Sequence, residues 1–182
     1  LNYRNKVVYH VLESEYLCLG LYKRNSLDLI RVDDFELAIP LVNEIVKKIN
    51  EKKIRVDSKK LKNIIFKNNS NSECLVTFVS TNKSFKGLNE LLELLKTIKE
   101  IKGITINIKN DSNKILGEES YLLYGDESIK ENNLIITDKS FMQVNFGVMN
   151  LTYQKIKEHL QGKKIIDAYS GIGSISYSIL NK

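Results

Sequence analysis

Two glycines near the carboxyl end of the chain follow an apolar run, in the stretch KKIIDAYSGIGSIS at residues 163–176. The run predicts a β-strand that ends at Asp167, and Gly171 and Gly173 predict a tight turn from that strand into a helix. A strand that turns through glycines into a helix is typical of the start of a nucleotide-binding parallel sheet. Because the chain ends at Lys182, we expect it to hold only the beginning of such a sheet.

Three cofactor classes compete for this loop. A phosphate-binding loop for ATP or GTP needs a lysine after its last glycine, and none follows Gly173. A dinucleotide loop needs a third glycine where Ser176 stands. S-adenosylmethionine sites often place an acidic residue at the strand end before G-x-G, and Asp167, Gly171 and Gly173 have that order. On this loop alone, glycines that merely permit the turn remain an equal alternative.

The preceding part of the chain predicts an α+β domain with a mixed or antiparallel sheet. Pairs of β-rich runs are followed by an amphipathic helix that begins at Pro40 and by another over residues 88–98. Isoleucines that alternate with polar residues over 104–109 predict a half-buried strand. This order does not fit alternating βαβ units. We therefore expect a central domain at residues 1–142 and the incomplete start of a Rossmann-like α/β domain at 143–182.

Charge and cysteine content narrow the class of protein. The 28 Lys and Arg residues against 22 Asp and Glu give a net charge of +6, which weakly favours a polyanionic partner. Cys18 and Cys74 form no CxxC pattern, so a disulfide framework is not expected and a reducing cytoplasm is. No apolar run reaches the roughly 20 residues that span a bilayer, so no membrane partner is expected.

Two motifs together resemble the RNA uracil-C5 methyltransferase family, which forms 5-methyluridine in ribosomal and transfer RNA. SFMQVN at residues 140–145 stands where that family has Ser-Phe-Phe-Gln-Val-Asn, and Tyr169 stands where it favours an aromatic residue, two before the first loop glycine. YRNKVVYHV and GLYKRNSLDLIRVDD look like the opening of its central domain. The resemblance implies S-adenosylmethionine as methyl donor and RNA as substrate, ribosomal RNA before transfer RNA.

The resemblance also implies roles for individual residues. It places Gln143, Tyr169, Gly171 and Gly173 at the cofactor, and Phe141 against a base extracted from its stack. The Gln143 amide also suits a uracil edge, or a purely structural hydrogen bond between domains. Asn145, which precedes the next predicted helix, is expected to cap it.

Two short basic clusters are candidates for phosphate contacts with RNA: Arg4, Lys6, Lys23 and Arg24. Tyr3, Tyr9 and Tyr22 lie among them in the sequence, a pattern that suits phosphate contact with base stacking in single-stranded RNA. A solvated basic face without any ligand is an equally good interpretation.

In family members with an iron–sulfur cluster, a fourth cysteine follows the strand that matches LIRVDD. Phe35 stands there in this chain, so we expect no cluster.

The family adds a cysteine thiolate to uracil C6, and that cysteine and the general base lie well after the glycine loop. We therefore expect this chain to contain no catalytic residue and to be inactive alone. The alternatives are a non-catalytic basic α+β RNA-binding module and a mixed-sheet scaffold with a protein partner. An uncovered strand at 163–169 could also let the fragment self-associate through its sheet edge.

Overall fold

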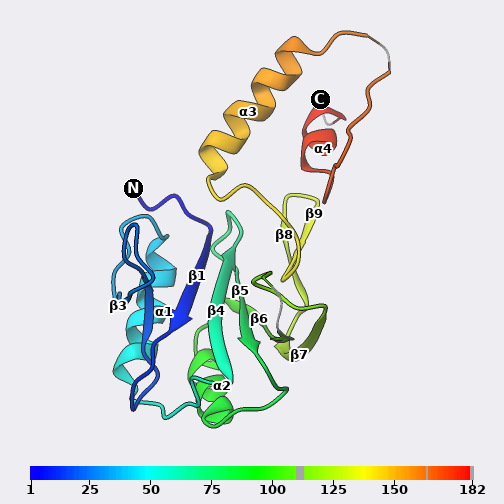
Figure 1. The fold of residues 1–182 in the computed structure, drawn as a ribbon. Helices are drawn as coiled ribbons and strands as arrows, with labels where there is room; N and C mark the ends of the chain where they lie inside the picture. Colours follow the sequence, from blue (N-terminus) through cyan, green and yellow to red (C-terminus); the bar gives the residue numbers. More distant parts are fainter. Residues whose placement is uncertain (110–112, 163, 181–182) are drawn as a thin grey trace.

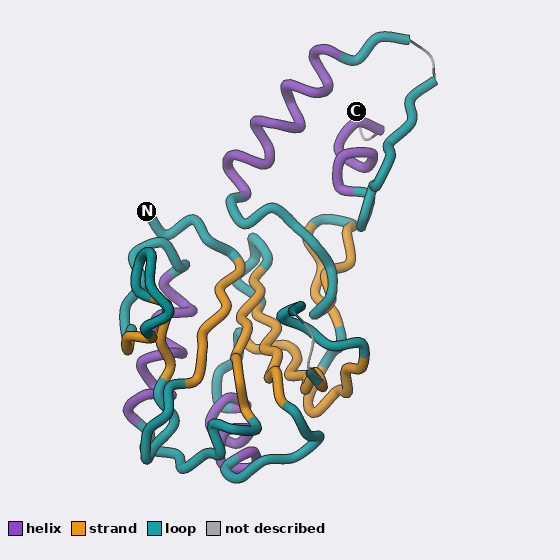
Figure 2. Tube along the Cα trace, in the orientation of Figure 1, coloured by secondary structure: helices purple, strands orange, loops and turns teal. Residues whose placement is uncertain are grey.

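The computed structural model describes residues 1–109, 113–162 and 164–180 (Figure 1). Its elements, in chain order, are β1 (Lys6–Val11), β2 (Leu19–Tyr22), β3 (Leu29–Arg31), α1 (Pro40–Glu51), β4 (Leu61–Asn68), β5 (Cys74–Ser80), α2 (Leu88–Lys96), β6 (Ile101–Ile108), β7 (Glu119–Gly125), β8 (Ser128–Glu131), β9 (Leu134–Thr137), α3 (Phe146–His159) and α4 (Ser174–Leu180). Figure 2 shows strands gathered into one body, with α3 and α4 set apart from it beyond the loop that follows β9.

A seven-stranded sheet in the order β3-β2-β1-β4-β5-β6-β7 forms this body. Strands β5 and β6 pair in parallel through the α2 crossover, whereas the other neighbouring pairs are antiparallel. The α+β class with a mixed sheet, predicted from the sequence, is thereby confirmed.

Helices α1 and α2 cover one face of the sheet. Pro40 occupies the first turn of α1, where its missing N–H costs nothing, and the apolar stripe that follows it is buried. Tyr9, Phe66 and Phe78 are fully buried in the same core. The two amphipathic helices predicted from the sequence are therefore confirmed, and their apolar faces form the main core.

The other face is partly covered by the hairpin of β8 and β9. Ile129 and Ile136 of the hairpin pack with Leu75 of β5, and Met142 packs against them. Strand β6 is buried along most of its length on both faces, so the prediction of a half-buried strand at 104–109 was wrong. Its polar positions are tolerated because they are hydrogen-bonded: Thr105 contacts Thr77, and the Asn107 amide donates to backbone oxygens near β7.

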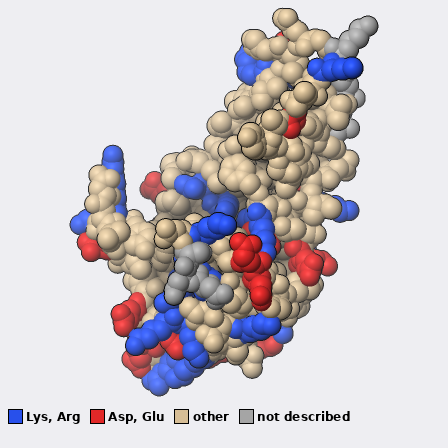
Figure 3. All heavy atoms as spheres, turned by 45° about the vertical axis from the view of Figure 1, so that its right-hand side comes forward, with Lys and Arg blue, Asp and Glu red and all other residues tan. Residues whose placement is uncertain are grey.

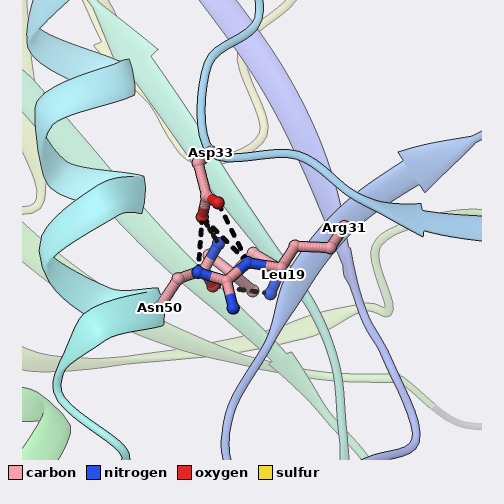
Figure 4. A network of polar contacts seen from close by, with 4 residues as sticks. All are labelled: Leu19, Arg31, Asp33 and Asn50. Atoms are coloured by element: carbon pink, nitrogen blue, oxygen red, sulfur yellow. Dashed lines mark hydrogen bonds and ion pairs between the residues drawn. The ribbon is translucent and has the colours of Figure 1, made fainter.

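A polar network that runs from the buried Asn50 to the exposed Arg31 fastens α1 to the β2–β3 edge of the sheet (Figure 4). Asn50 Oδ1 accepts from the Leu19 backbone N–H at 2.8 Å, and Asn50 Nδ2 donates to Asp33 at 2.7 Å. Arg31 Nε donates to both oxygens of the Asp33 carboxylate. Burial alone would raise the pKa of Asp33, but the hydrogen bonds from Arg31 and Asn50 hold it below its usual range. This edge is thereby held by side chains as well as by short strands.

The last forty residues are far less buried than the body. Met149 is the one buried residue of α3, and none in the described part of α4 is buried. Val148, Leu151 and Leu180 are largely exposed, and most of the surface in the upper part of Figure 3 is uncharged. No helix of the described residues is long and apolar enough to cross a membrane. The apolar side chains of this region therefore meet solvent in this chain.

The strand predicted at 163–169 is absent among the described residues 164–169. Ile165 is 49% exposed and Ile166 93% exposed, and no strand of the described residues pairs with them. A strand needs a hydrogen-bonding neighbour, so this run stays irregular. The described residues 164–169 therefore form no strand edge, and self-association of the chain stays a prediction. The turn into a helix after the glycines is confirmed by α4, which begins at Ser174.

Candidate functional site

The segment at residues 140–145, SFMQVN, lies against the residues just before β1 and is fastened to them through its own backbone. Asn5 is 5% exposed; its Nδ2 donates to the Gln143 carbonyl at 3.0 Å and its backbone N–H to the Val144 carbonyl at 2.9 Å. Arg4 forms an isolated antiparallel bridge with Asn145. The main chain of residues 143–145 is therefore held against the residues that precede β1.

Lys67, at the end of β4, holds the other end of this segment. Its Nζ donates to the backbone oxygens of Thr137, Asp138 and Ser140 at 2.8, 2.6 and 2.6 Å. The residue is 6% exposed, and burial, with a smaller effect of Lys6, lowers the pKa of Lys67 to about 8. Neither Lys67 nor Asn5 was predicted as a site residue. The available signal was a lysine placed within the apolar strand IIFKN.

Side-chain exposure alternates along the fastened segment. Phe141 is 72% exposed and Gln143 is exposed, whereas Met142 between them packs against the hairpin. In an extended chain alternate residues point to the same side, so Phe141 and Gln143 face solvent together. Within the described residues, Gln143 is hydrogen-bonded through its backbone carbonyl, which leaves its side-chain amide for a ligand.

Asn145 ends the segment and starts α3. Its Oδ1 accepts from the Val148 backbone N–H at 3.1 Å, which satisfies one of the free donors of the first helical turn. The predicted cap is confirmed. It fixes the direction in which α3 leaves the anchored segment.

The glycine loop has an unusual backbone. Tyr169, Gly171 and Gly173 have φ of 59, 57 and 75°, all in the left-handed region. A Cβ added at Gly171 or Gly173 would meet nothing within 4 Å, so backbone conformation and not crowding requires glycine here. The Tyr169 side chain is fully exposed, and positive φ is uncommon for a tyrosine.

Hydrogen bonds tie the loop to its neighbours. Asp167 accepts from Ser176 Oγ at 2.6 Å and from its backbone N–H at 3.3 Å, so this carboxylate holds the start of α4. Tyr153 of α3 donates to Ser174 Oγ at 2.7 Å. No hydrogen bond between described side chains joins Phe141 or Gln143 to the loop, and α3 connects the two motifs along the chain.

The basic clusters predicted to touch RNA separate into two places. Arg4 and Lys6 lie at the anchored segment, and burial lowers the pKa of Lys6. Lys23 and Arg24 are exposed in the turn between β2 and β3. Tyr9 is fully buried against Phe66, with ring centroids 5.9 Å apart, so base stacking by Tyr9 was a wrong prediction. Its position in β1 faces the helices and not solvent.

Neither cysteine is placed for nucleophilic catalysis. Cys74 is completely buried, and burial raises the pKa of its thiol to about 12. Burial also raises the pKa of Cys18. A nucleophilic cysteine needs an accessible thiolate, which both positions disfavour. No group of three or more His, Cys, Asp or Glu side chains among the described residues could hold a metal ion.

The chain is similar over its full length to bacterial proteins named RNA methyltransferases. It is 35% identical to an uncharacterized RNA methyltransferase of Fusobacterium nucleatum, covering 100% of this chain and 43% of the relative. It is 32% identical to one of Lactococcus lactis, covering 100% of the chain and 44% of the relative. No protein-family model matches the chain. The chain thus spans less than half the length of these relatives.

A solved structure shares the fold. The crystal structure of the Pyrococcus abyssi tRNA (uracil-54, C5)-methyltransferase in complex with S-adenosyl-L-homocysteine matches with a TM-score of 0.74. The match covers 98% of this chain and 46% of the other, at 21% identity. At that identity the similarity concerns the fold. It includes the α+β body and the segment that leads to the glycine loop.

Proposed function

Because the chain belongs to the family of these RNA methyltransferases, we propose that the whole protein transfers a methyl group from S-adenosylmethionine to carbon 5 of a uridine in RNA. The observation that carries the proposal is the anchored SFMQVN segment, whose main chain is fixed while Phe141 and Gln143 face solvent. Rigid support for exposed recognition side chains is what a base-binding site requires. In this proposal residues 1–142 form the central domain and residues 143–182 begin the catalytic domain.

The glycine loop suits the cofactor in its backbone and its openness. S-adenosylmethionine supplies an electrophilic methyl group, and Tyr169, Gly171 and Gly173 would lie against it with Gln143. Space is open at both glycines, so main chain can approach a ligand closely. The exposed Tyr169 ring offers an aromatic surface beside that main chain. Phe141 would stack on the extracted uracil.

Carbon 5 of uracil is a poor nucleophile, and addition of a thiolate to carbon 6 makes it reactive. The burial of Cys18 and Cys74 disfavours either thiolate as the nucleophile. We therefore assign the nucleophile and the general base to parts of the protein outside this chain. This chain then contributes positioning of the base and half of the cofactor site. Its own residues bind and orient and do not carry out the bond-making step.

The proposal is tested with the full-length protein, S-adenosylmethionine, and ribosomal and transfer RNA that lack the modification. Digestion of the RNA to nucleosides should yield 5-methyluridine, with ribosomal RNA the expected substrate of the two. A product methylated only on ribose or on another base would contradict the assignment to carbon 5.

The 182-residue chain alone should show fast amide exchange over residues 164–180 and bind S-adenosylmethionine weakly or not at all. The described part of α4 has no buried residue and the run before the loop has no strand partner, so few contacts protect these amides. Hydrogen exchange and calorimetric titration measure both. Strong protection of this region in a monomer, with tight cofactor binding, would show that the chain completes the site unaided.

A further inference from the structure

The face of the sheet opposite α1 and α2 contains a hollow of about 760 Å³ at the end of β1 away from the anchored segment. Its lining is mainly polar and basic, and six of its residues carry the argument: His10, Tyr22, Lys59, Lys62, Asn63 and Lys109. This volume is within the range of pockets that hold molecules of nucleotide size. No residue of the glycine loop or of the SFMQVN segment lines it.

An aromatic surface in the hollow is formed by Tyr22 and His10. Their ring centroids lie 4.4 Å apart at an interplanar angle of 55°, and Tyr22 is 50% exposed. Asn63 is 6% exposed, and its Nδ2 lies 2.7 Å from His10 Nδ1. Since the amide nitrogen can only donate, Nδ1 accepts and Nε2 carries the proton of the neutral ring. Burial and the nearby Lys109 lower the pKa of His10, which favours the neutral ring.

Three lysines surround this aromatic pair. Lys59 and Lys62 come from the start of β4 and the turn before it, and Lys109 follows β6. No ion pair with another described residue neutralises any of the three, and Glu13 is the carboxylate among the lining residues. In the view of Figure 3, basic and acidic side chains are mixed over the lower part of the molecule. What distinguishes the hollow is that three lysines without an ion pair among the described residues line it together with this aromatic pair.

The register of β1 and β4 relates the hollow to the anchored segment. Lys6 pairs with Lys67 at one end of this strand pair, and His10 pairs with Asn63 at the other. Opposite residues of an antiparallel pair share a face, and so do residues two or four apart in a strand. The two places therefore lie on the same face of the sheet, separated by about 13 Å along β1.

We propose that this hollow binds a nucleotide of single-stranded RNA flanking the target uridine, with its base on Tyr22 and its phosphates at Lys59, Lys62 and Lys109. Neutral polar and aromatic groups surrounded by lysines suit a base joined to a charged backbone. Lys23 and Arg24, which directly follow Tyr22 in the exposed turn, extend the basic border. The inference rests on the proposed RNA substrate and adds a second contact that sets the register of the RNA strand.

Binding of a fluorescent single-stranded RNA oligonucleotide to the full-length protein, measured at several salt concentrations, tests the proposal. Tyr22→Ala should raise Kd five- to hundredfold, the usual effect of losing one stacked base. The double change Lys59→Ala/Lys62→Ala should make the slope of log affinity against log salt about 1.4 less steep. The matched control is Lys47→Ala/Lys48→Ala on the exposed side of α1, which should change neither value. Melting temperatures of all variants check that the fold is intact.

The outcomes separate this inference from the proposed function. Equal affinities in wild-type protein and in the hollow variants, or an equal loss in the control pair, would overturn the inference while leaving methylation unaffected. If the hollow variants bind RNA more weakly than the control pair, but the protein forms no 5-methyluridine, the RNA contact is supported and the proposed reaction is contradicted. A protein that binds no RNA at low salt would contradict both.

Discussion

Gln143→Ala in the full-length protein should lower kcat/KM for RNA methylation by about tenfold or more without changing the melting temperature. The backbone carbonyl of Gln143, and not its side chain, makes the hydrogen bond to Asn5, so truncating the side chain leaves the anchor intact. A buried polar group of the substrate left without its partner costs about 1–3 kcal/mol, which corresponds to this loss of rate. Steady-state methylation with RNA and S-adenosylmethionine varied in turn measures it.

Gln154→Ala is the matched control, because Gln154 is also an exposed glutamine and lies on α3, where it contacts Glu158. It should leave kcat/KM within a factor of about two, as expected for a surface position. Unchanged kinetics for Gln143→Ala would remove Gln143 from the site and leave only its backbone role.

Lys67→Met should lower the free energy of unfolding by about 1–3 kcal/mol. It should also lower RNA methylation by the full-length protein, because the SFMQVN segment would lose its anchor. The ammonium of Lys67 donates hydrogen bonds to three backbone oxygens, and methionine cannot replace these bonds. A buried acceptor without a donor lowers the stability of the folded state. Chemical denaturation measures the free energy of unfolding. Lys130→Met, at an exposed lysine of the β8–β9 hairpin, is the control and should change stability by less than about 0.5 kcal/mol. Equal effects in the two variants would contradict the anchoring role.

The pH dependence of stability gives a second measurement on Lys67. Its folded-state pKa of about 8 lies below the ordinary value of 10.5, so between these values the unfolded chain binds more protons than the folded one. The free energy of unfolding of the wild type should therefore rise with pH in this window relative to Lys67→Met, by up to about 3 kcal/mol. Below pH 8 both states are protonated and the difference should be flat.

Periodicity predicted the body of the fold well because its elements are locally encoded. The helix after Pro40 and the helix at Leu88–Lys96 have apolar stripes that any core would bury, and both form as expected. Strand β6 was misjudged for a tertiary reason. Its polar residues alternate as in a solvent-facing strand, but the hairpin of β8 and β9 and the turn near Gly117 cover them. The alternation of polar and apolar residues along a strand does not show whether another element packs on the face that carries the polar residues.

The candidate site was predicted in its motif but not in its support. SFMQVN can be recognised in the sequence because its residue types stand at a fixed spacing. Asn5 and Lys67 cannot be recognised in this way, because they bind backbone oxygens of a segment more than sixty residues away in sequence. Tyr9 shows the opposite failure, since proximity to basic residues along the chain indicated RNA and strand alternation turned its ring into the core. The strand at 163–169 failed because β-structure depends on a partner that the described residues do not supply.

The most direct test of the proposed reaction at carbon 5 is release of tritium from RNA whose uridines carry the label at that carbon. The full-length protein with S-adenosylmethionine should release tritium to water in step with methyl incorporation, because the carbon 5 proton leaves after methyl transfer. Gln143→Ala should slow both to the same extent. Methyl incorporation without tritium release would place the methyl group elsewhere, and release no greater than background from a folded, cofactor-bound protein would contradict the account.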